Sequence, residues 1–476
     1  MARRRSSKKA STSTEPPKAD LTSAMKLFST LMEGFEYKDS LDPDARPTQK
    51  MIYTNGVTLW MLILQRLGGG QSLDKVVTAL VSQGSELLPD NKRVRENTLS
   101  ENTSAYSKAR SRLPLDFIHK FSERVCDYLG RNSPPILKGR RVFLLDGTTI
   151  TLPPTPVLKK AFPPAINQHG ESVWPIAQLM VAVEMQSGCA LLPQVDPMYG
   201  PNNASEATQA QRIVKLLPEK SIVLADSGFG IFSVAYHTTE AGHDVMFRLT
   251  HSRFKALRRQ AELIEEGRTH KSFHLIWKPS SKDSNANPDL PSDASIEVLL
   301  HEIQITPQET LYLVSTLEVD APTSANVYRS RYNIEFDIRD VKVTLDTENI
   351  RAKSLEMFYK ELYTSFVAYN LITQFRRQAA KIARVEPRRL SFKRSWTTMQ
   401  YRLLLQGPCS FDEWLDRYDE ALYRCSLKKH PIRKKERSYA RKAHPRRPKS
   451  TKFEKSQRQK TASVQAKPPP LLSQSK

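Results

Sequence analysis

The sequence predicts an α/β fold built on a mixed sheet, with a helical segment before the sheet and long helices after it. Three observations lead to this prediction. Apolar residues follow helical spacing through residues 21–133, strand-like runs begin at about residue 140, and helical spacing returns from about residue 326 to 381. Strands, a helix, a further strand and a β-rich insertion in this order indicate a mixed sheet with helices packed on it.

The first segment, residues 21–133, is expected to form a small helical domain with a basic face at Lys108, Arg110 and Arg112. Its stretch "GVTLWMLILQRLGGGQSLDKVVTALVSQ" shows helical spacing that three consecutive glycines interrupt. Ser100 or Asn102 is suited to cap a helix in "TLSENTSAYSKARSRLP". One helix face then repeats at steps of three and four through Leu115, Ile118, Phe121 and Val125.

The strands are predicted from β-branched and apolar runs. They are "RRVFLLDGTTITL", "WPIAQLMVAVEMQSGCALLPQV", "SIVLADSGFG" and "HDVMFRLT". Residues 251–320 hold further runs of this kind, "FHLIWKP", "IEVLLHEIQI" and "TLYLVSTLEV", around a Pro/Asp/Ser-rich loop at 279–294. We therefore expect a core at 134–385 that carries a β-rich insertion, followed by a helical region at 386–426.

Positive charge is concentrated at the two ends of the chain. The formal net charge is +23, and residues 427–476 contain 17 Lys and Arg residues against two Glu residues. Residues 1–20 add six cations and two acids. Both ends are expected to be disordered, and they are interpreted either as solubilising tails or as tails that lie along DNA. The second interpretation is favoured because Lys and Arg release counterions from phosphates.

Several classes of protein are excluded by what the sequence lacks. The four cysteines show no CxxC spacing, which argues against a structural zinc site and a disulfide framework. There is no apolar run of 18 residues, no apolar segment behind the basic N-terminus and no Gly-rich phosphate loop. We expect a soluble, cytoplasmic protein with no membrane partner.

Two acidic residues follow buried strands in the same pattern. Asp146 follows "VFLL" and Asp226 follows "IVLA", and each is followed closely by glycine. Each acid alone is explained as a residue that ends a strand and begins a turn. Ligands also bind at the carboxyl ends of strands in α/β folds, and the repeated pattern favours this second interpretation.

A third acid lies in "YRSRYNIEFDIRDVK", residues 328–342. At 100° per residue, its polar residues Tyr328, Arg331, Glu335 and Lys342 fall within a stripe about 60° wide. One explanation is a solvated face of salt bridges. The other is a site in which the Glu binds a metal ion while the cations hold phosphates. Three carboxylates suit Mg²⁺ or Mn²⁺, and two such ions catalyse phosphoryl transfer on DNA.

These motifs together resemble the DDE transposases of the insertion-sequence-four class. "LLDGTT", "LADSGFG" and Y-x2-R-x3-E-x6-K are similar to that family, whose YREK signature is matched by Tyr328, Arg331, Glu335 and Lys342. The resemblance covers about residues 50–385. It implies an RNase H-like core that cuts transposon ends and joins them to target DNA without a covalent protein–DNA intermediate.

The resemblance also implies a role for each site residue. Asp146, Asp226 and Glu335 would be the catalytic, metal-binding triad for Mg²⁺ or Mn²⁺. Tyr328, Arg331 and Lys342 would contact the transposon end near the scissile phosphate. Some relatives stack a flipped base on a Trp of the insertion, for which Trp277 is the candidate, although a Trp in the core is the default.

The implied partners are double-stranded DNA, as terminal inverted repeats and as target, and a second copy of the chain in a synaptic complex. The implied location is the bacterial cytoplasm, at the nucleoid. Two alternatives remain at this stage: a decayed or domesticated DNA-binding protein without catalysis, and a metal-dependent nuclease without strand transfer.

Overall fold

The computed structural model describes residues 28, 30–32, 51–83, 88–89, 91–96, 98–168, 170–404 and 411–430. The basic ends at 1–20 and 431–476 lie outside these residues. Contacts divide the chain into the units Met1–His430 and Pro431–Lys476, and everything below concerns the first of them. Among the described residues, no helix is both long enough and apolar enough to cross a membrane.

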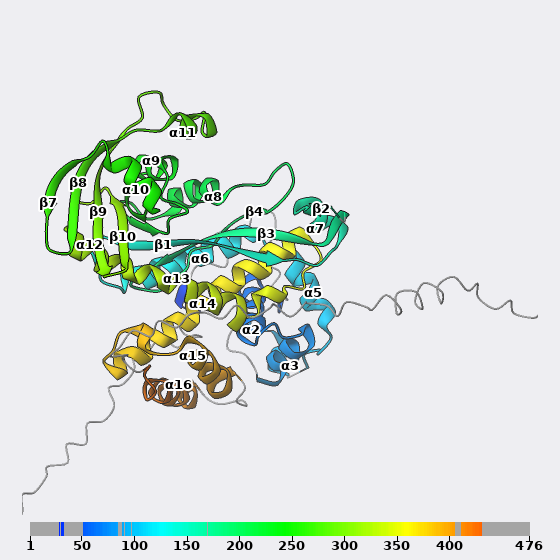
Figure 1. The fold of residues 1–476 in the computed structure, drawn as a ribbon. Coiled ribbons are helices and arrows are strands. Elements are labelled where there is room, and N and C mark those ends of the chain that lie inside the picture. Colours follow the sequence, from blue (N-terminus) through cyan, green and yellow to red (C-terminus); the bar gives the residue numbers. More distant parts are fainter. Residues whose placement is uncertain are drawn as a thin grey trace, which may run out of the picture. The chain divides into compact units, whose positions relative to one another are not determined.

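A ten-stranded mixed sheet organises the first unit (Figure 1). Three of its central strands are antiparallel, and two more run parallel to β1. The predicted α/β class with a mixed sheet is confirmed. In spatial order the central strands are β4 (Gln194–Pro197), β3 (Gly170–Glu184), β1 (Val142–Thr151), β5 (Ile222–Ala225) and β6 (Asp244–Arg248).

The strand β1 shows why the sheet needs helices on both faces. Val142 and Leu144 belong to one hydrophobic cluster, and Phe143 and Leu145 belong to another. Successive side chains of a strand point to opposite faces, so each cluster occupies one face. The run "VFLL" is therefore continuously apolar, as expected for a strand buried on both sides.

Different helices cover the two faces (Figure 1). α8 (Glu206–Ile213) and α9 (Phe232–Glu240) contribute Ala210, Ile213 and Val234 to the cluster of Phe143. α6 (Leu115–Arg131) and α14 (Leu355–Ala383) contribute to the cluster on the other face. The short elements α7 (Pro156–Ala161) and β2 (Pro164–Asn167) lie beside β3, and β2 pairs with the N-terminal part of that strand.

The insertion extends the sheet beyond β6. β10 (Glu309–Ser315) pairs with β6 in the antiparallel sense, and β9 (Ile296–Thr306), β8 (His270–Trp277) and β7 (Glu262–Glu266) follow in order. β8, β9 and β10 lie in the three segments predicted as strands. Two short helices accompany the strands, α10 (His251–Arg258) and α11 (Ser281–Ala286). α11 lies within the stretch expected to be a loop, where Ser280 and Asp283 form a capping box.

The N-terminal helices include α2 (Asn55–Leu67), which ends at the three glycines. Gly69 and Gly70 have φ angles of 71° and 74°, in the left-handed region that glycine adopts without strain. Asn102, one of the two expected caps, accepts a hydrogen bond from Ser104 N at the start of α5. The remaining helices here are α3 (Leu73–Gln83), α4 (Lys92–Arg95), α5 (Thr103–Arg112) and α6.

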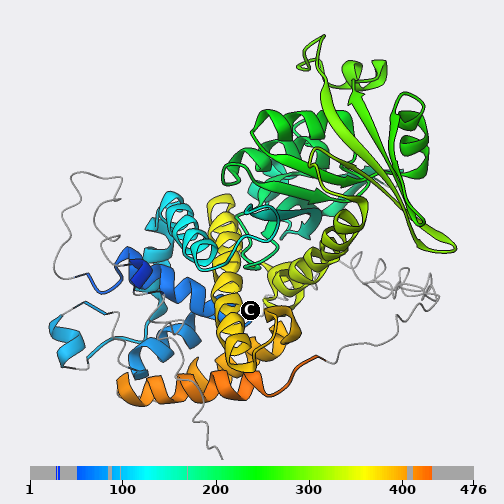
Figure 2. The same cartoon turned by 90° about the vertical axis from the view of Figure 1, so that its left-hand side faces the viewer.

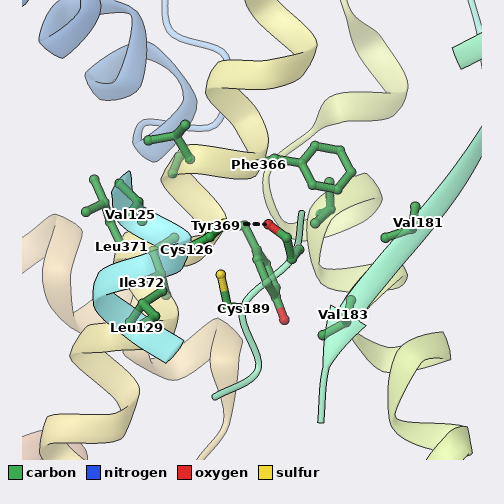
Figure 3. Packing of buried hydrophobic residues seen from close by; sticks show 14 of the residues in the cluster. Val125, Cys126, Leu129, Val181, Val183, Cys189, Phe366, Tyr369, Leu371 and Ile372 are labelled. Carbon is green, nitrogen blue, oxygen red and sulfur yellow. Dashed lines mark hydrogen bonds between the residues drawn. The ribbon is translucent and has the colours of Figure 1, made fainter. Parts of the chain in front are cut away.

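The long helix α14 connects these N-terminal helices with the sheet (Figure 2). Its apolar residues Phe366, Leu371 and Ile372 lie in the same cluster as Leu129 of α6 and Val183 of β3 (Figure 3). Side chains are buried around the whole circumference of α14. α15 (Phe392–Met399) and α16 (Phe411–Ser426) pack on its C-terminal part.

A buried ion network joins α14 to the N-terminal helices. Glu361 accepts hydrogen bonds from Arg66 of α2 at 2.9 Å and from Arg110 of α5 at 2.8 Å. Burial lowers the pKa of Arg66, whereas the charge of Glu361 raises it. One carboxylate therefore pairs with two cations from separate helices, the buried Arg66 and the largely buried Arg110.

Replacing Glu361 with Ala is expected to destabilise the protein by about 3–5 kcal/mol, because both guanidinium groups would remain buried without a counter-charge. Urea unfolding followed by circular dichroism measures this change. The control is Glu420→Ala, which removes a 46% exposed carboxylate of α16 and its ion pairs with the exposed Arg402 and Arg424, and which is expected to change stability by less than about 1 kcal/mol. Equal losses in both variants would contradict a stabilising role for the buried network.

Candidate functional site

Two acidic residues lie level with each other on neighbouring parallel strands. Leu144 of β1 is paired with Leu224 of β5, and Asp146 and Asp226 each follow two residues later. Asp146 lies within β1, where the buried half of the strand ends, and Asp226 follows the last residue of β5. Parallel strands place their carboxyl ends at the same edge of a sheet, so both acids lie where ligands bind in α/β folds.

The segment with the YREK-like spacing is helical but is not one regular α-helix. It consists of α12 (Ala321–Arg329), a 3₁₀ turn at Ser330–Tyr332, α13 (Asn333–Arg339) and a π-helical turn at Asp340–Thr344. The stripe derived at 100° per residue assumed a continuous α-helix, which does not form here. Changes between 3₁₀, α and π geometry within a helix are frequent at functional sites.

Three of the four polar residues in this segment nevertheless reach the central strands. Tyr328 donates a hydrogen bond to the carbonyl of Ala225, the residue before Asp226, at 3.2 Å. Arg331 Nη1 lies 3.7 Å from Asp146 Oδ2. Lys342 donates to Thr148 Oγ1, two residues beyond Asp146, at 3.2 Å. The segment therefore packs along the edge that carries both aspartates.

The fourth residue, Glu335, is held by Arg331. The Arg331 Nη2 atom donates to Glu335 Oε1 at 2.8 Å, so one guanidinium group lies between Asp146 and Glu335. Arg331 is only 7% exposed, whereas the Glu335 side chain is 48% exposed. A buried Arg331 is inconsistent with the alternative of a fully solvated salt-bridge face.

The electrostatics of the site show crowded negative charge. Burial raises the pKa of Asp146 to about 6, against the opposing effect of Arg331. The charges of Asp226 and Glu335 raise it further, so these three carboxylates are close enough to interact. A hydrogen bond from Gly147 N to Asp146 Oδ1, 2.9 Å long, partly offsets the rise.

A further carboxylate, Glu206, was missed in the sequence. It is the first residue of α8, and burial and the charge of Asp226 raise its pKa. A Cβ atom at position 147 would lie 2.4 Å from Glu206 Oε1, so Gly147 gives this carboxylate room beside β1. The only signal in the sequence is a Ser-Glu pair typical of a helix start, which does not indicate a site.

A second set of residues that the sequence did not reveal holds α13 in place. Asp337 is buried two residues after Glu335 and accepts two hydrogen bonds from Arg388, at 2.7 and 2.8 Å. Tyr369 of α14 donates a third at 2.9 Å. This bidentate pair fixes the backbone that carries Glu335.

The donor set is suited to a hard cation. Carboxylate oxygens are the protein ligands that Mg²⁺ and Mn²⁺ prefer. Burial, and to a smaller extent the charges of Asp226 and Glu335, raise the pKa of Asp146, and a bound cation would oppose this rise. Within the described residues, no three His, Cys, Asp or Glu side chains are grouped closely enough to hold a metal ion. In this arrangement the guanidinium of Arg331 is the cation between Asp146 and Glu335.

Trp277, the candidate for base stacking, lies apart from this arrangement. It is 6% exposed at the end of β8 and packs edge-on against Phe232 of α9, with ring centroids 5.5 Å apart. Within the part of the chain that the structure describes, no hydrogen bond, ion pair or ring contact joins it to Asp146, Asp226 or Glu335. Its indole belongs to the hydrophobic cluster that the insertion shares with α9.

Comparisons with known proteins found one family model and similar solved structures. Residues 137–371 match a family model described as "Transposase DDE domain". A cryo-electron-microscopy structure of the piggyBac transposase synaptic complex with hairpin DNA is similar over 83% of this chain and 82% of that chain, with 10% sequence identity and a TM-score of 0.38. No curated protein sequence matches the chain. The segment 137–371, which is similar to this transposase DDE domain family, contains Asp146, Asp226 and Glu335.

Proposed function

We propose that the chain is a cut-and-paste DNA transposase of the insertion-sequence-four class, which cleaves transposon ends and joins them to target DNA. The observation that carries this proposal is the convergence of Tyr328, Arg331 and Lys342 on the strand residues around Asp146 and Asp226. All of them lie within the segment that is similar to the transposase DDE domain family. The YREK-like spacing supports the assignment to this class.

The triad Asp146, Asp226 and Glu335 would hold Mg²⁺ or Mn²⁺. Such ions activate a water or a 3′-hydroxyl and stabilise the leaving oxygen of a phosphodiester. Carboxylates are collected at one edge of the sheet, where Arg331 and the N–H group of Gly147 partly offset the charge of Asp146. Burial and the neighbouring acids raise the pKa of Asp146 to about 6, so a bound cation would stabilise its ionised form, and this supports a cation-binding role.

The two cations of the segment have different tasks in this proposal. Arg331 has a planar group that grips a phosphate with two hydrogen bonds, and Lys342 is a point charge on a flexible stem. Arg331 now bonds to Glu335 and lies near Asp146, so a metal ion on these acids would free its guanidinium for the DNA. Tyr328 anchors the segment to β5 through Ala225, and burial raises the pKa of its hydroxyl, which stays protonated.

The proposed partners are the terminal inverted repeats, the target DNA and a second copy of the chain in a synaptic complex. The helices of residues 21–133 would recognise the ends, and the basic tails would add affinity that does not depend on sequence. Trp277 would accept a flipped base only if the insertion rearranged, because its indole is now buried. The proposed location is the bacterial nucleoid.

Replacement of Asp146 or Asp226 by Asn, or of Glu335 by Gln, is expected to reduce cleavage of DNA carrying the element's terminal repeats by more than about 100-fold. Loss of a metal ligand exceeds the roughly 10- to 100-fold effect of losing an outer partner. Binding of the same DNA is expected to persist. Gel shifts and supercoiled-plasmid cleavage with Mg²⁺ measure both properties.

The same assay separates the alternative functions. Wild-type binding without cleavage would indicate a non-catalytic DNA-binding protein. Cleavage without joined products would indicate a nuclease. Parallel loss of binding and cleavage in all three variants would contradict the proposed division between the triad and the DNA-binding cations.

The raised pKa of Asp146 predicts a pH dependence in metal-free protein. Because its pKa is about 6 in the folded state and about 3.9 in an unfolded chain, folding favours the protonated acid. Its contribution to stability is fully present below the unfolded pKa and is lost as the pH rises through about 6.

The free energy of unfolding of wild type relative to Asp146→Asn is therefore expected to fall by about 1–3 kcal/mol between pH 4 and pH 7 in the presence of a chelator. Urea unfolding at each pH measures the difference. Mg²⁺ is expected to reduce the fall, because a bound cation favours the ionised acid. A difference that stays constant with pH would contradict the crowded negative charge inferred for the site.

A further inference from the structure

Lys342, one of the two proposed phosphate-binding cations, has a carboxylate partner outside the catalytic triad. Its Nζ atom lies 3.2 Å from Thr148 Oγ1 on β1 and 3.2 Å from Glu348 Oε1. The Lys342 side chain is 20% exposed, and that of Glu348 is 50% exposed. The more exposed Glu348 carboxylate thus contacts an ammonium group that is itself partly accessible to solvent, and so to a phosphate.

The backbone that carries Glu348 is fixed to the π-helical turn that carries Lys342. Glu348 lies in a 3₁₀ turn, Thr347–Asn349, and the fully buried Thr347 donates to the carbonyl of Val341 at 2.7 Å. Asn349 donates to Asp346 at 2.6 Å, and Asp346 has left-handed backbone geometry with φ of 56°. This turn thus holds the backbone of Glu348 beside Lys342, whereas the Glu348 side chain is half exposed to solvent.

The two cations differ in what can release them. The partners of Arg331 are Asp146 and Glu335, which belong to the proposed metal-binding triad. The partner of Lys342 is Glu348, which does not. Metal binding would therefore free Arg331 but leave Lys342 paired, and a phosphate that approaches Lys342 would compete with Glu348 for the ammonium charge.

We propose, on the basis of the proposed function, that Glu348 competes with DNA phosphate for Lys342 and so restrains DNA binding. The carboxylate provides negative charge at the place where a phosphate oxygen would bind. Because phosphate contacts carry no sequence information, the restraint applies to transposon ends and to unrelated duplexes alike. Glu348 is thus an inhibitory contact within the DNA-binding site.

Replacement of Glu348 by Gln is expected to lower the Kd of the full chain for both kinds of duplex by about two- to fivefold, the range expected for an exposed ion pair. The salt dependence of log Kd is expected to steepen, by up to about one unit of slope, because Lys342 then neutralises a phosphate without competition. Fluorescence anisotropy with labelled duplexes in a chelator measures both quantities.

Two comparisons show whether the effect passes through Lys342. The control Glu171→Gln removes a similarly exposed carboxylate, which pairs with Lys159 at 2.9 Å on another part of the sheet, and reports the effect of net charge alone. In a Lys342→Ala background, Glu348→Gln is expected to have no effect beyond this control. A second variant, Glu348→Ala, and the thermal unfolding midpoint of each protein exclude a folding defect.

The outcomes are distinct. An effect of Glu348→Gln equal to that of Glu171→Gln, or one that persists without Lys342, overturns the inference while leaving the proposed function intact. Failure of the wild-type chain to bind either duplex overturns the proposed function and the inference with it. Tighter binding that requires Lys342 supports the inference.

Discussion

Burial of Asp146 beside other carboxylates at one edge of the sheet is the constraint on which the rest of the site depends. Asp146 and Asp226 are level because β1 and β5 are parallel neighbours, so the sheet itself brings their charges together. Burial raises the pKa of Asp146, and the charge of Asp226 adds to this rise. The other residues of the site supply positive charge, hydrogen bonds or packing to carboxylates whose ionised forms would otherwise be unfavourable at this place.

The mechanical support comes from residues far away in sequence. α13 lies against the sheet because Asp337 is bound by Arg388 and Tyr369, and Tyr369 belongs to α14. α14 is in turn fixed to the N-terminal helices by the ion network of Glu361. The position of Glu335 is therefore determined by packing that begins in the first third of the chain and ends beyond α14.

The sequence predicted the parts of this arrangement that local patterns determine. Buried strands followed by Asp146 and Asp226 have a clear periodicity, and Tyr328, Arg331, Glu335 and Lys342 have a recognisable spacing. The change from 3₁₀ to α to π geometry could not be predicted, because it depends on contacts with β1 and β5 rather than on propensity. The partner of Asp337 lies 51 positions away and that of Arg66 lies 295 positions away, beyond any periodic signal.

Both proposed DNA-binding cations are neutralised by carboxylates of the chain in the structure described here. Unpaired buried charge is strongly unfavourable, so a largely buried Arg331 requires a counter-charge before any ligand arrives. Lys342 is similarly satisfied by Glu348 and Thr148. In the proposed function, binding of metal and DNA would therefore replace the carboxylate partners of Arg331 and Lys342 with DNA phosphates, so that the charges of the site stay balanced. The exchange of partners at Arg331 would depend on the metal ion, whereas the exchange at Lys342 would depend only on the phosphate. The binding of metal and the binding of phosphate by Lys342 are therefore separable steps.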